Sequence, residues 1–243
     1  NKFNICLSSS NESQKYLIKL GVKNVKFYGN LKFSESEKEI KETSYKLKKY
    51  FNSKIIWCAS STHQSEEIFC GKVHRELKKK FKNLLTIIIP RHVERINTIK
   101  SELVDLNLKI HIHSSRTKIN NNVDIYLVDT YGKTKSFYSA CQNVFLGGSL
   151  INHGGQNPLE AARFGCNILH GPNIFNFKEI YSFLKKNNLS KEIFNQKVII
   201  KELTGFFSKK RNPKKIQKKI NLIGQNILKN TLNEINLLLK NAN

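Results

Sequence analysis

Residues 145–177 hold the feature that most constrains this chain, a glycine-rich loop between a buried strand and a helix. The apolar residues 144–146 predict a short strand, which Gly147-Gly148 would end. A second pair, Gly154-Gly155, keeps the loop free of side chains, so that a ligand could contact the backbone. Such a loop is typical of α/β proteins, with a bound ligand or without one.

The helix after this loop opens with a full set of start signals. Asn157 suits the N-cap, Pro158 the first helical position, and Glu160 the position from which a carboxylate reaches back to the cap. Gly165 suits the left-handed end of the helix. Because a helix start presents unpaired N–H groups and a positive dipole end, the segment predicts a phosphate or nucleotide site. A capping role alone would also explain Glu160.

Apolar strands alternate with amphipathic helices along most of the chain. The expected strands are 4–7, 25–28, 54–59, 84–89, 109–113, 125–128, 144–146 and 167–170, and the expected helices are 12–20, 34–51, 66–82, 93–105, a short one from 157 and a long one from 213. Strands that are apolar on both sides imply a parallel sheet covered on both faces. We therefore predict an α/β protein with a Rossmann-like parallel sheet, whose ligand lies beyond the carboxyl ends of the strands.

The long helix from Pro213 has one apolar stripe. Its members are Ile216, Ile220, Ile223, Ile227 and Leu228. Their spacing is that of one helix face. We expect this stripe to pack partly on the first 33 residues.

The composition is strongly basic, with 42 Lys+Arg against 18 Asp+Glu and a formal net charge of +24. Such an excess suggests an anionic partner, either nucleic acid or a membrane surface. Abundant Lys, Asn and Ile fit an AT-rich genome equally well, because the Lys residues are spread over several helical segments. The 5 Cys show no metal-ligand spacing. They read as reduced core thiols of a cytoplasmic protein, and we expect no metal site.

The chain contains no Met, and no stretch approaches 18 apolar residues. No basic segment followed by an apolar core opens it either, so neither a transmembrane helix nor a signal peptide is expected. The missing initiator predicts that the chain is a fragment of a longer protein.

Five ordered sequence blocks carry a resemblance to a known family. The glycine segment, in the pattern GGSL…GG…NPLE…GP…NF, resembles the signature of the transferases that add 3-deoxy-D-manno-octulosonic acid (Kdo) to lipid A precursors. Four further blocks resemble the same family in the same order, namely YGNLKF at 28–33, WCASSTHQSEE at 57–67, IPRHVER at 89–95 and VDTYG at 128–132.

The resemblance implies a two-domain GT-B glycosyltransferase that transfers Kdo from CMP-Kdo to a lipid A precursor (lipid IVA) in lipopolysaccharide core synthesis. Residues 1–33 would be a remnant of the N-terminal acceptor domain plus a linker. Residues 34–243 would form the C-terminal nucleotide-sugar-binding domain with its long terminal helix. The general base would lie upstream of Asn1, so the isolated chain is expected to bind the donor without transferring Kdo. The implied location is the cytoplasmic face of the bacterial inner membrane, where the protein would be peripheral or anchored through the missing N-terminus, and no cofactor is implied.

Carried over residue by residue, the donor contacts of the family fall on loops that follow the strands. They are Ser61, Thr62, His63, Pro90, Arg91, His92, Tyr131, Gly132, Lys133, Gly147, Gly148, Ser149, Asn157, Pro158, Leu159 and Glu160. The Arg91 guanidinium suits a phosphate. Glu160 would accept from the ribose hydroxyls, and the Gly147-Gly148 amides with Ser149 would approach the phosphate or carboxylate of the donor.

Three positions depart from the family pattern. Lys133 stands where the family has Glu, Gln156 where it commonly has His, and Ser65 where it has Gly before Glu66-Glu67. The departure makes Lys133 doubtful as an equivalent contact, although its backbone could still serve.

Two other kinds of function remain open at this point. Another GT-B glycosyltransferase that uses a UDP-sugar would show a similar glycine loop and ribose carboxylate. A non-enzymatic, basic, nucleic-acid-binding α/β domain would share the charge, but the sequence has no zinc spacing, RNP-like strand or helix-turn-helix signature. We therefore expect the CMP-Kdo donor, the lipid A precursor and an anionic membrane surface as partners, and no specific nucleic acid.

Overall fold

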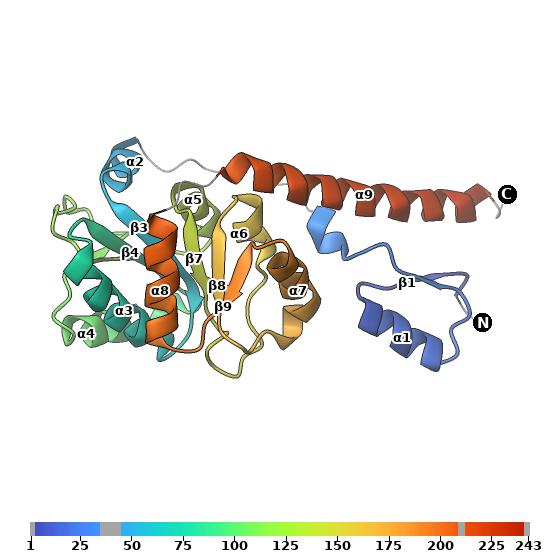
Figure 1. Cartoon of the computed structure of the whole chain (residues 1–243), viewed down its shortest axis with the longest axis horizontal. Coiled ribbons are helices and arrows are strands. Elements are labelled where there is room, and N and C mark those ends of the chain that lie inside the picture. Colours follow the sequence, from blue (N-terminus) through green and yellow to red (C-terminus); the bar gives the residue numbers. More distant parts are fainter. Residues whose placement is uncertain (1–2, 35–44, 209–211, 241–243) are drawn as a thin grey trace. The chain divides into compact units, whose positions relative to one another are not determined.

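The computed structural model describes residues 3–34, 45–208 and 212–240 of the chain (Figure 1). Its contacts divide the chain into two compact units. The smaller unit combines Asn1–Glu39 with Lys214–Asn243, and the larger unit is Ile40–Pro213.

The larger unit contains a seven-stranded sheet with the strand order β5-β6-β4-β3-β7-β8-β9, in which every pair of neighbours is parallel. The strands are β3 (Ile55–Thr62), β4 (Leu84–Pro90), β5 (Ile110–Ile112), β6 (Ile125–Leu127), β7 (Asn143–Leu146), β8 (Asn167–His170) and β9 (Ser190–Glu192). The chain runs outward from β3 in one direction through β4 and then outward in the other direction through β7. This reversal creates a switch point beside β3, which is where open α/β sheets bind ligands.

Helices cover both faces of this sheet (Figure 1). Helices α3 (Glu66–Lys80), α4 (Ile96–Val104) and α8 (Gln196–Phe207) share one buried apolar cluster with Trp57 and Ala59 of β3. Ser60, which alternates with these residues, instead reaches Tyr138 of α5 (Thr134–Ala140) on the other face. Also on that face are α2 (Tyr45–Asn52), α6 (Leu159–Arg163) and α7 (Lys178–Lys186). The predicted fold class is confirmed.

Four elements of the larger unit are absent from the sequence expectations, namely α5, α7, β9 and α8. Strand β9 is only three residues long and its last two residues are exposed, so it shows no apolar pattern. Short 3-10 helices occur at Val93–Arg95, before α4, and at Phe175–Phe177, before α7. Of the helix expected over 34–51, residues 35–44 lie outside the described residues, and α2 is the described part.

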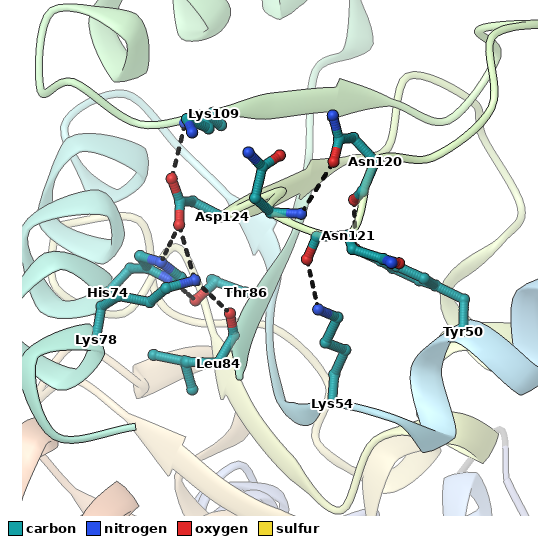
Figure 2. Close-up of polar contacts among 11 residues, drawn as sticks. Tyr50, Lys54, His74, Lys78, Leu84, Thr86, Lys109, Asn120, Asn121 and Asp124 are labelled. Carbon is teal, nitrogen blue, oxygen red and sulfur yellow. Dashed lines mark hydrogen bonds and ion pairs between the residues drawn. The ribbon is translucent and has the colours of Figure 1, made fainter. Parts of the chain in front are cut away.

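A polar network lies at the amino-terminal ends of the strands (Figure 2). The buried His74 of α3 contacts Thr86 of β4 through Nδ1 at 2.8 Å and Asp124, just before β6, through Nε2 at 3.3 Å. The Asp124 carboxylate also accepts from the Lys109 amide at 2.9 Å and pairs with Lys78 at 3.0 Å. These contacts tie α3 to β4 and β6 at the edge of the sheet opposite the glycine loop.

The smaller unit begins with a strand–helix–strand piece, as the sequence predicts. Strands β1 (Cys6–Leu7) and β2 (Val25–Lys26) are parallel, and α1 (Asn11–Lys19) connects them. The Ser10 hydroxyl caps α1 by accepting from the Ser13 amide at 2.9 Å. A 3-10 helix at Leu31–Ser34 follows.

Helix α9 (Pro213–Lys240) packs on the first 33 residues within the smaller unit, which confirms the expectation for its apolar stripe. A Cβ at Gly29 would come within 2.6 Å of the Ile227 side chain. Glu234 accepts from Lys26 at 2.7 Å and from the Tyr28 hydroxyl at 2.5 Å. The stripe is narrower than predicted, because Leu228 is 40% exposed.

These contacts group α9 with residues 1–39, whereas the sequence analysis grouped it with residues 34–243. The assignment of the first 33 residues to an acceptor domain stays a prediction. Within the described ranges, every helix is too short or too polar to cross a membrane.

Candidate functional site

A pocket of about 310 Å³ opens where strands β3, β4 and β7 end and where the loop after β6 and the start of α6 meet. Half of the residues predicted for the donor line it, namely Ser61, Pro90, Arg91, Tyr131, Gly132, Lys133, Asn157 and Glu160. It also contains six residues that the sequence analysis did not assign to the site, namely Ile89, Thr130, Thr134, Tyr138, Leu146 and Gln156. Its size is at the lower end of the range for small-molecule sites.

Ser61 enters the pocket through an irregularity in strand β3. The register of β3 against β4 shifts between Ser60 and Thr62, and Ser61 has φ 54°, in the left-handed region. Non-glycine residues in this conformation carry strain that a functional site commonly explains. The bulge turns Ser61 toward the pocket and leaves Thr62 buried outside it.

The start of α6 forms one side of the pocket. The Asn157 side chain accepts from the Leu159 amide at 3.1 Å, so it satisfies one of the free donors of the helix start. The helix begins at Leu159, with Pro158 at the N-cap, which is one residue later than the sequence predicts. Pro158 and Leu159 are buried and lie outside the pocket.

The capping box predicted for Glu160 does not form. Glu160 lies in the first turn of α6, and none of the described residues donates a hydrogen bond to its carboxylate. The carboxylate therefore keeps its acceptor capacity for a ligand in the pocket. At the end of the same helix, Gly165 has φ 73° and confirms the predicted left-handed termination.

The loop after β6 lines one side of the pocket. The Thr130 hydroxyl is buried and has no hydrogen-bond partner among the described residues. A buried hydroxyl without a partner is costly, so Thr130 is suited to a ligand oxygen. The Tyr131 hydroxyl donates to Glu94 at 3.1 Å, and Gly132 has φ 73°, a conformation that favours glycine.

The charges of the pocket suit a nucleoside monophosphate. Arg91 and Lys133 bring two cations, and Glu160 brings one carboxylate. Lys133 lies in the pocket although the family has Glu at this position. A phosphate is attracted to the cations, and a carboxylate can accept from the hydroxyls of a ribose.

A buried carboxylate accepts hydrogen bonds from the backbone of the glycine loop after β7. Glu66, at the start of α3, is 1% exposed and accepts four backbone N–H groups. Its Oε2 accepts from the backbone amides of His63 at 2.9 Å and Gly148 at 2.7 Å. Its Oε1 accepts from the backbone amides of Ser149 at 3.2 Å and Leu150 at 3.0 Å. In the sequence, Glu66 belongs to one of the family blocks, but nothing in that block predicts this role.

This arrangement corrects the prediction that the glycine-loop amides face the donor. The Gly148 and Ser149 amides are used by Glu66, and the Gly147 amide donates to Ser60 O at 2.9 Å. The Ser149 hydroxyl is buried between Leu146 O at 2.6 Å and the Gly171 amide at 2.7 Å. Gly147, Gly148 and Ser149 therefore build the loop and lie outside the pocket lining.

Close packing explains why Gly147 carries no side chain. A Cβ at this position would lie 2.5 Å from Ser61 O, 2.6 Å from Thr62 Cα and 2.7 Å from Glu66 Oε2. A methyl group here would therefore push the loop away from Glu66. Ser65, where the family has Gly, has φ 75°, which is the conformation that favours glycine.

His63 and His92 lie next to the pocket rather than in its lining. The His63 ring is buried, with its centroid 5.6 Å from that of His92 and 4.2 Å from that of His153. Burial, followed by the charges of His153, His92 and the arginines Arg91 and Arg95, lowers the pKa of His63 to about 4. The His63 ring is therefore neutral at neutral pH, chiefly because it is buried.

The second glutamate of this block is also structural. Glu67 is buried and receives Arg95 in a bidentate pair, with distances of 3.1 Å and 3.3 Å. Burial raises the pKa of Glu67 even though Arg95 opposes that shift. Within the described part of the chain, no group of three His, Cys, Asp or Glu residues is arranged to hold a metal ion.

The chain has clear sequence relatives, although no protein-family model matches it. It is 31% identical over 210 residues to a 3-deoxy-D-manno-octulosonic acid transferase of Rickettsia prowazekii, covering 84% of this chain and 44% of the relative. It is 38% identical over 129 residues to the enzyme of the same name from Haemophilus influenzae, covering 53% of this chain and 30% of the relative. The chain thus spans less than half the length of these two relatives.

Solved structures show the same fold. The C-terminal CMP-Kdo binding domain of WaaA from Acinetobacter baumannii matches with a TM-score of 0.63 at 24% identity, over 74% of this chain and 91% of that one. HepE from Anabaena, in complex with UDP and glucose, matches with a TM-score of 0.53 at 11% identity, over 96% of this chain and 62% of that one. The sheet is that of GT-B C-terminal domains. The chain is thus a relative of the 3-deoxy-D-manno-octulosonic acid transferases.

Proposed function

We propose that this chain is the donor-binding part of a glycosyltransferase that transfers Kdo from CMP-Kdo to a lipid A precursor. The observation that carries the proposal is the pocket at the ends of β3, β4 and β7, which combines Arg91 and Lys133 with the free carboxylate of Glu160. The sequence relatives named Kdo transferases support the same donor.

In this proposal CMP lies in the pocket with its phosphate near Arg91 and its ribose near Glu160. The guanidinium stabilises the negative charge that CMP gains as it leaves the sugar. The buried Thr130 hydroxyl is a further donor for a ligand oxygen. A general base must take the proton of the acceptor hydroxyl, and this role falls to a part of the enzyme other than the pocket described here.

Glu160→Ala is expected to weaken CMP binding about 10-fold to 100-fold in isothermal titration calorimetry, since a hydrogen bond to a charged group contributes about 1–3 kcal/mol. The loss should be smaller for deoxycytidine monophosphate, which lacks the 2′-hydroxyl. Glu160 makes no capping contact, so the melting temperature should change little. If the folded Glu160→Ala protein binds CMP with unchanged affinity, Glu160 does not contact the nucleotide.

A matched control and competing nucleotides sharpen this test. Glu76→Ala removes a carboxylate that is 41% exposed and pairs with Lys79 at 2.7 Å, and it should leave CMP binding unchanged. UMP and UDP are titrated in parallel, and tighter binding of UDP would favour a UDP-sugar donor. RNA that binds with a steep salt dependence and does not compete with CMP would favour a nucleic-acid-binding domain.

The anionic surface of a membrane is a further partner in this proposal, because the proposed acceptor is a lipid, and the location is the cytoplasmic face of the bacterial inner membrane. With a net charge of +24, the chain is expected to sediment with vesicles that contain anionic phosphatidylglycerol, and to be released as salt rises. Equal binding to purely zwitterionic vesicles, or binding that does not change with salt, would show that the positive charge reflects composition and not membrane binding.

A further inference from the structure

Two exposed phenylalanines lie at the edge of the sheet where the pocket proposed for CMP opens. Phe175, after β8, is 61% exposed, and Phe194, after β9, is 67% exposed. Strands β8 and β9 are parallel neighbours (Figure 1), so the segments that follow them leave the same edge of the sheet. Neither ring lines the pocket, and the proposed function therefore gives them no role.

Backbone hydrogen bonds hold the segment around Phe175 against the glycine loop. The Asn173 amide donates to Ser149 O at 3.0 Å, and the Asn176 amide donates to Gly154 O at 3.2 Å. A Cβ at Gly154 would lie 2.7 Å from Cε2 of Phe175, so the ring lies against the backbone of the loop. The exposed side of the Phe175 ring is therefore held in a fixed place.

The residues on either side of Phe194 fix its backbone in the same way. Ile193 is fully buried, and its amide donates to His170 O at 2.7 Å. Asn195 caps α8, since its side chain accepts from the Val198 amide at 3.0 Å. A large apolar side chain that is held in water gives up the stabilisation that burial would provide. Two such rings at one edge therefore indicate a surface that binds another molecule.

The charges around the two rings identify the kind of partner. Residues 171–200 contain 5 Lys and 2 Glu, with no Asp or Arg. Lys178 and Lys197 are exposed in the first turns of α7 and α8. A cation in a first turn is unfavourable for the helix dipole, so helix stability does not explain these positions. Apolar rings flanked by ammonium groups fit the surface of an anionic bilayer, where rings reach the acyl chains and lysines meet the phosphates.

We propose that the carboxyl edge of the sheet beside β8 and β9 docks on an anionic membrane, with Phe175 and Phe194 inserted and with Lys178 and Lys197 at the lipid phosphates. Because all strands of this sheet are parallel, the pocket at the ends of β3, β4 and β7 opens at the same edge. Docking here brings the pocket toward the bilayer that contains a lipid acceptor. The inference rests on the proposed function for its membrane partner, and it adds the surface that makes the contact.

Tryptophan replacements test the insertion directly. Trp57 is the single Trp and is fully buried, so its emission should not respond to lipid. Phe175→Trp and Phe194→Trp should each shift their emission to shorter wavelength with phosphatidylglycerol vesicles, and brominated lipid should quench it. Val104→Trp, at a site that is 49% exposed at the end of α4 and at the opposite edge of the sheet, is the control and should show neither change. Leu232→Trp, at a 48% exposed site on α9, tests the other apolar surface of the chain.

Sedimentation with the same vesicles measures the size of the contribution. Phe175→Ser combined with Phe194→Ser should weaken binding about tenfold or more. Lys178→Gln combined with Lys197→Gln should weaken it by a similar factor, because each lysine near an anionic surface contributes about fivefold. Lys109→Gln, at an exposed site just before β5 and at the opposite edge, should change binding by less than about twofold. The melting temperatures of these variants should stay unchanged.

The outcomes separate this proposal from the proposed function. If the parent chain does not bind phosphatidylglycerol vesicles, both this surface and the membrane partner of the proposed function are wrong. If the parent chain binds but neither Phe175→Trp nor Phe194→Trp responds, this surface alone is wrong. An equal response of Val104→Trp, or a response of Leu232→Trp alone, would also overturn it. Titration with CMP reports separately on the donor pocket, which shares no residue with this surface.

Discussion

Glu66→Ala is expected to lower the free energy of unfolding by about 4 kcal/mol or more, among the largest effects of any single substitution in this chain. The carboxylate is buried and accepts four backbone N–H groups, from His63 and from the three residues 148–150. Each buried donor left without a partner costs roughly 1–3 kcal/mol, and only part of that is recovered if water enters. Urea unfolding followed by circular dichroism measures the loss.

The conservative variant separates hydrogen bonding from volume. Glu66→Gln keeps the shape but replaces one acceptor oxygen with an amide nitrogen, which must then face N–H donors. About half of the alanine effect is expected. Glu76→Ala, on the same helix but only partly buried, should change stability by less than about 0.5 kcal/mol. A Glu66→Ala protein that loses less than about 1 kcal/mol would show that the loop does not depend on this carboxylate.

Asp124→Ala is expected to cost about 3 kcal/mol at pH 7, because it leaves the buried His74 Nε2–H without an acceptor and the Lys109 amide without a partner. Since a carboxylate only accepts, His74 Nε2 carries the hydrogen and Nδ1 accepts from Thr86 (Figure 2). Urea unfolding of the variant and of the parent chain at pH 7 gives the difference.

The stability that Asp124 contributes is expected to depend on pH. Burial alone would raise the pKa of Asp124, but hydrogen bonds from His74, Lys109 and Lys78 lower it below its usual range. A carboxyl whose pKa is lowered in the folded protein contributes its full stabilisation at pH values above its unfolded pKa, which is near 3.8. That stabilisation is lost as the pH falls below this pKa. The deficit of Asp124→Asn should therefore shrink when the pH is lowered from 5 to 3. A deficit that stays constant over this range would contradict the role of the charged form, and Asp105→Asn, at an exposed site, is the control.

The pocket could be anticipated in part because its residues lie directly after strands. Each block that suggested a ligand follows a strand whose apolar run is evident in the sequence, and parallel strands bring their carboxyl ends to one edge. Arg91, Lys133 and Glu160 meet there for this reason. Thr130 and Gln156 were missed because nothing in a threonine or a glutamine at these positions signals burial against a cavity.

The hydrogen bonds of the glycine loop depend on a residue far away in the sequence. Two glycines before a helix suggested free amides for a phosphate, but those amides bond to Glu66, which lies 82 and 83 residues away in the chain. The cap of α6 differs for a similar reason, since Pro158 and Leu159 are drawn into the core and the helix begins one residue later. The residues adjacent in sequence give no signal of either contact.

The sequence by itself determined the fold class, the parallel strands from β3 to β8 and the edge of the sheet at which the pocket opens. It could do so because apolar periodicity and helix start signals depend on neighbours a few residues apart. Only the tertiary structure decided which groups are free to bind, separating the used amides of the glycine loop from the open carboxylate of Glu160 and the buried hydroxyl of Thr130. The physical reason is that a polar group is free only when no distant residue has already satisfied it, and such pairing is set by packing rather than by local pattern.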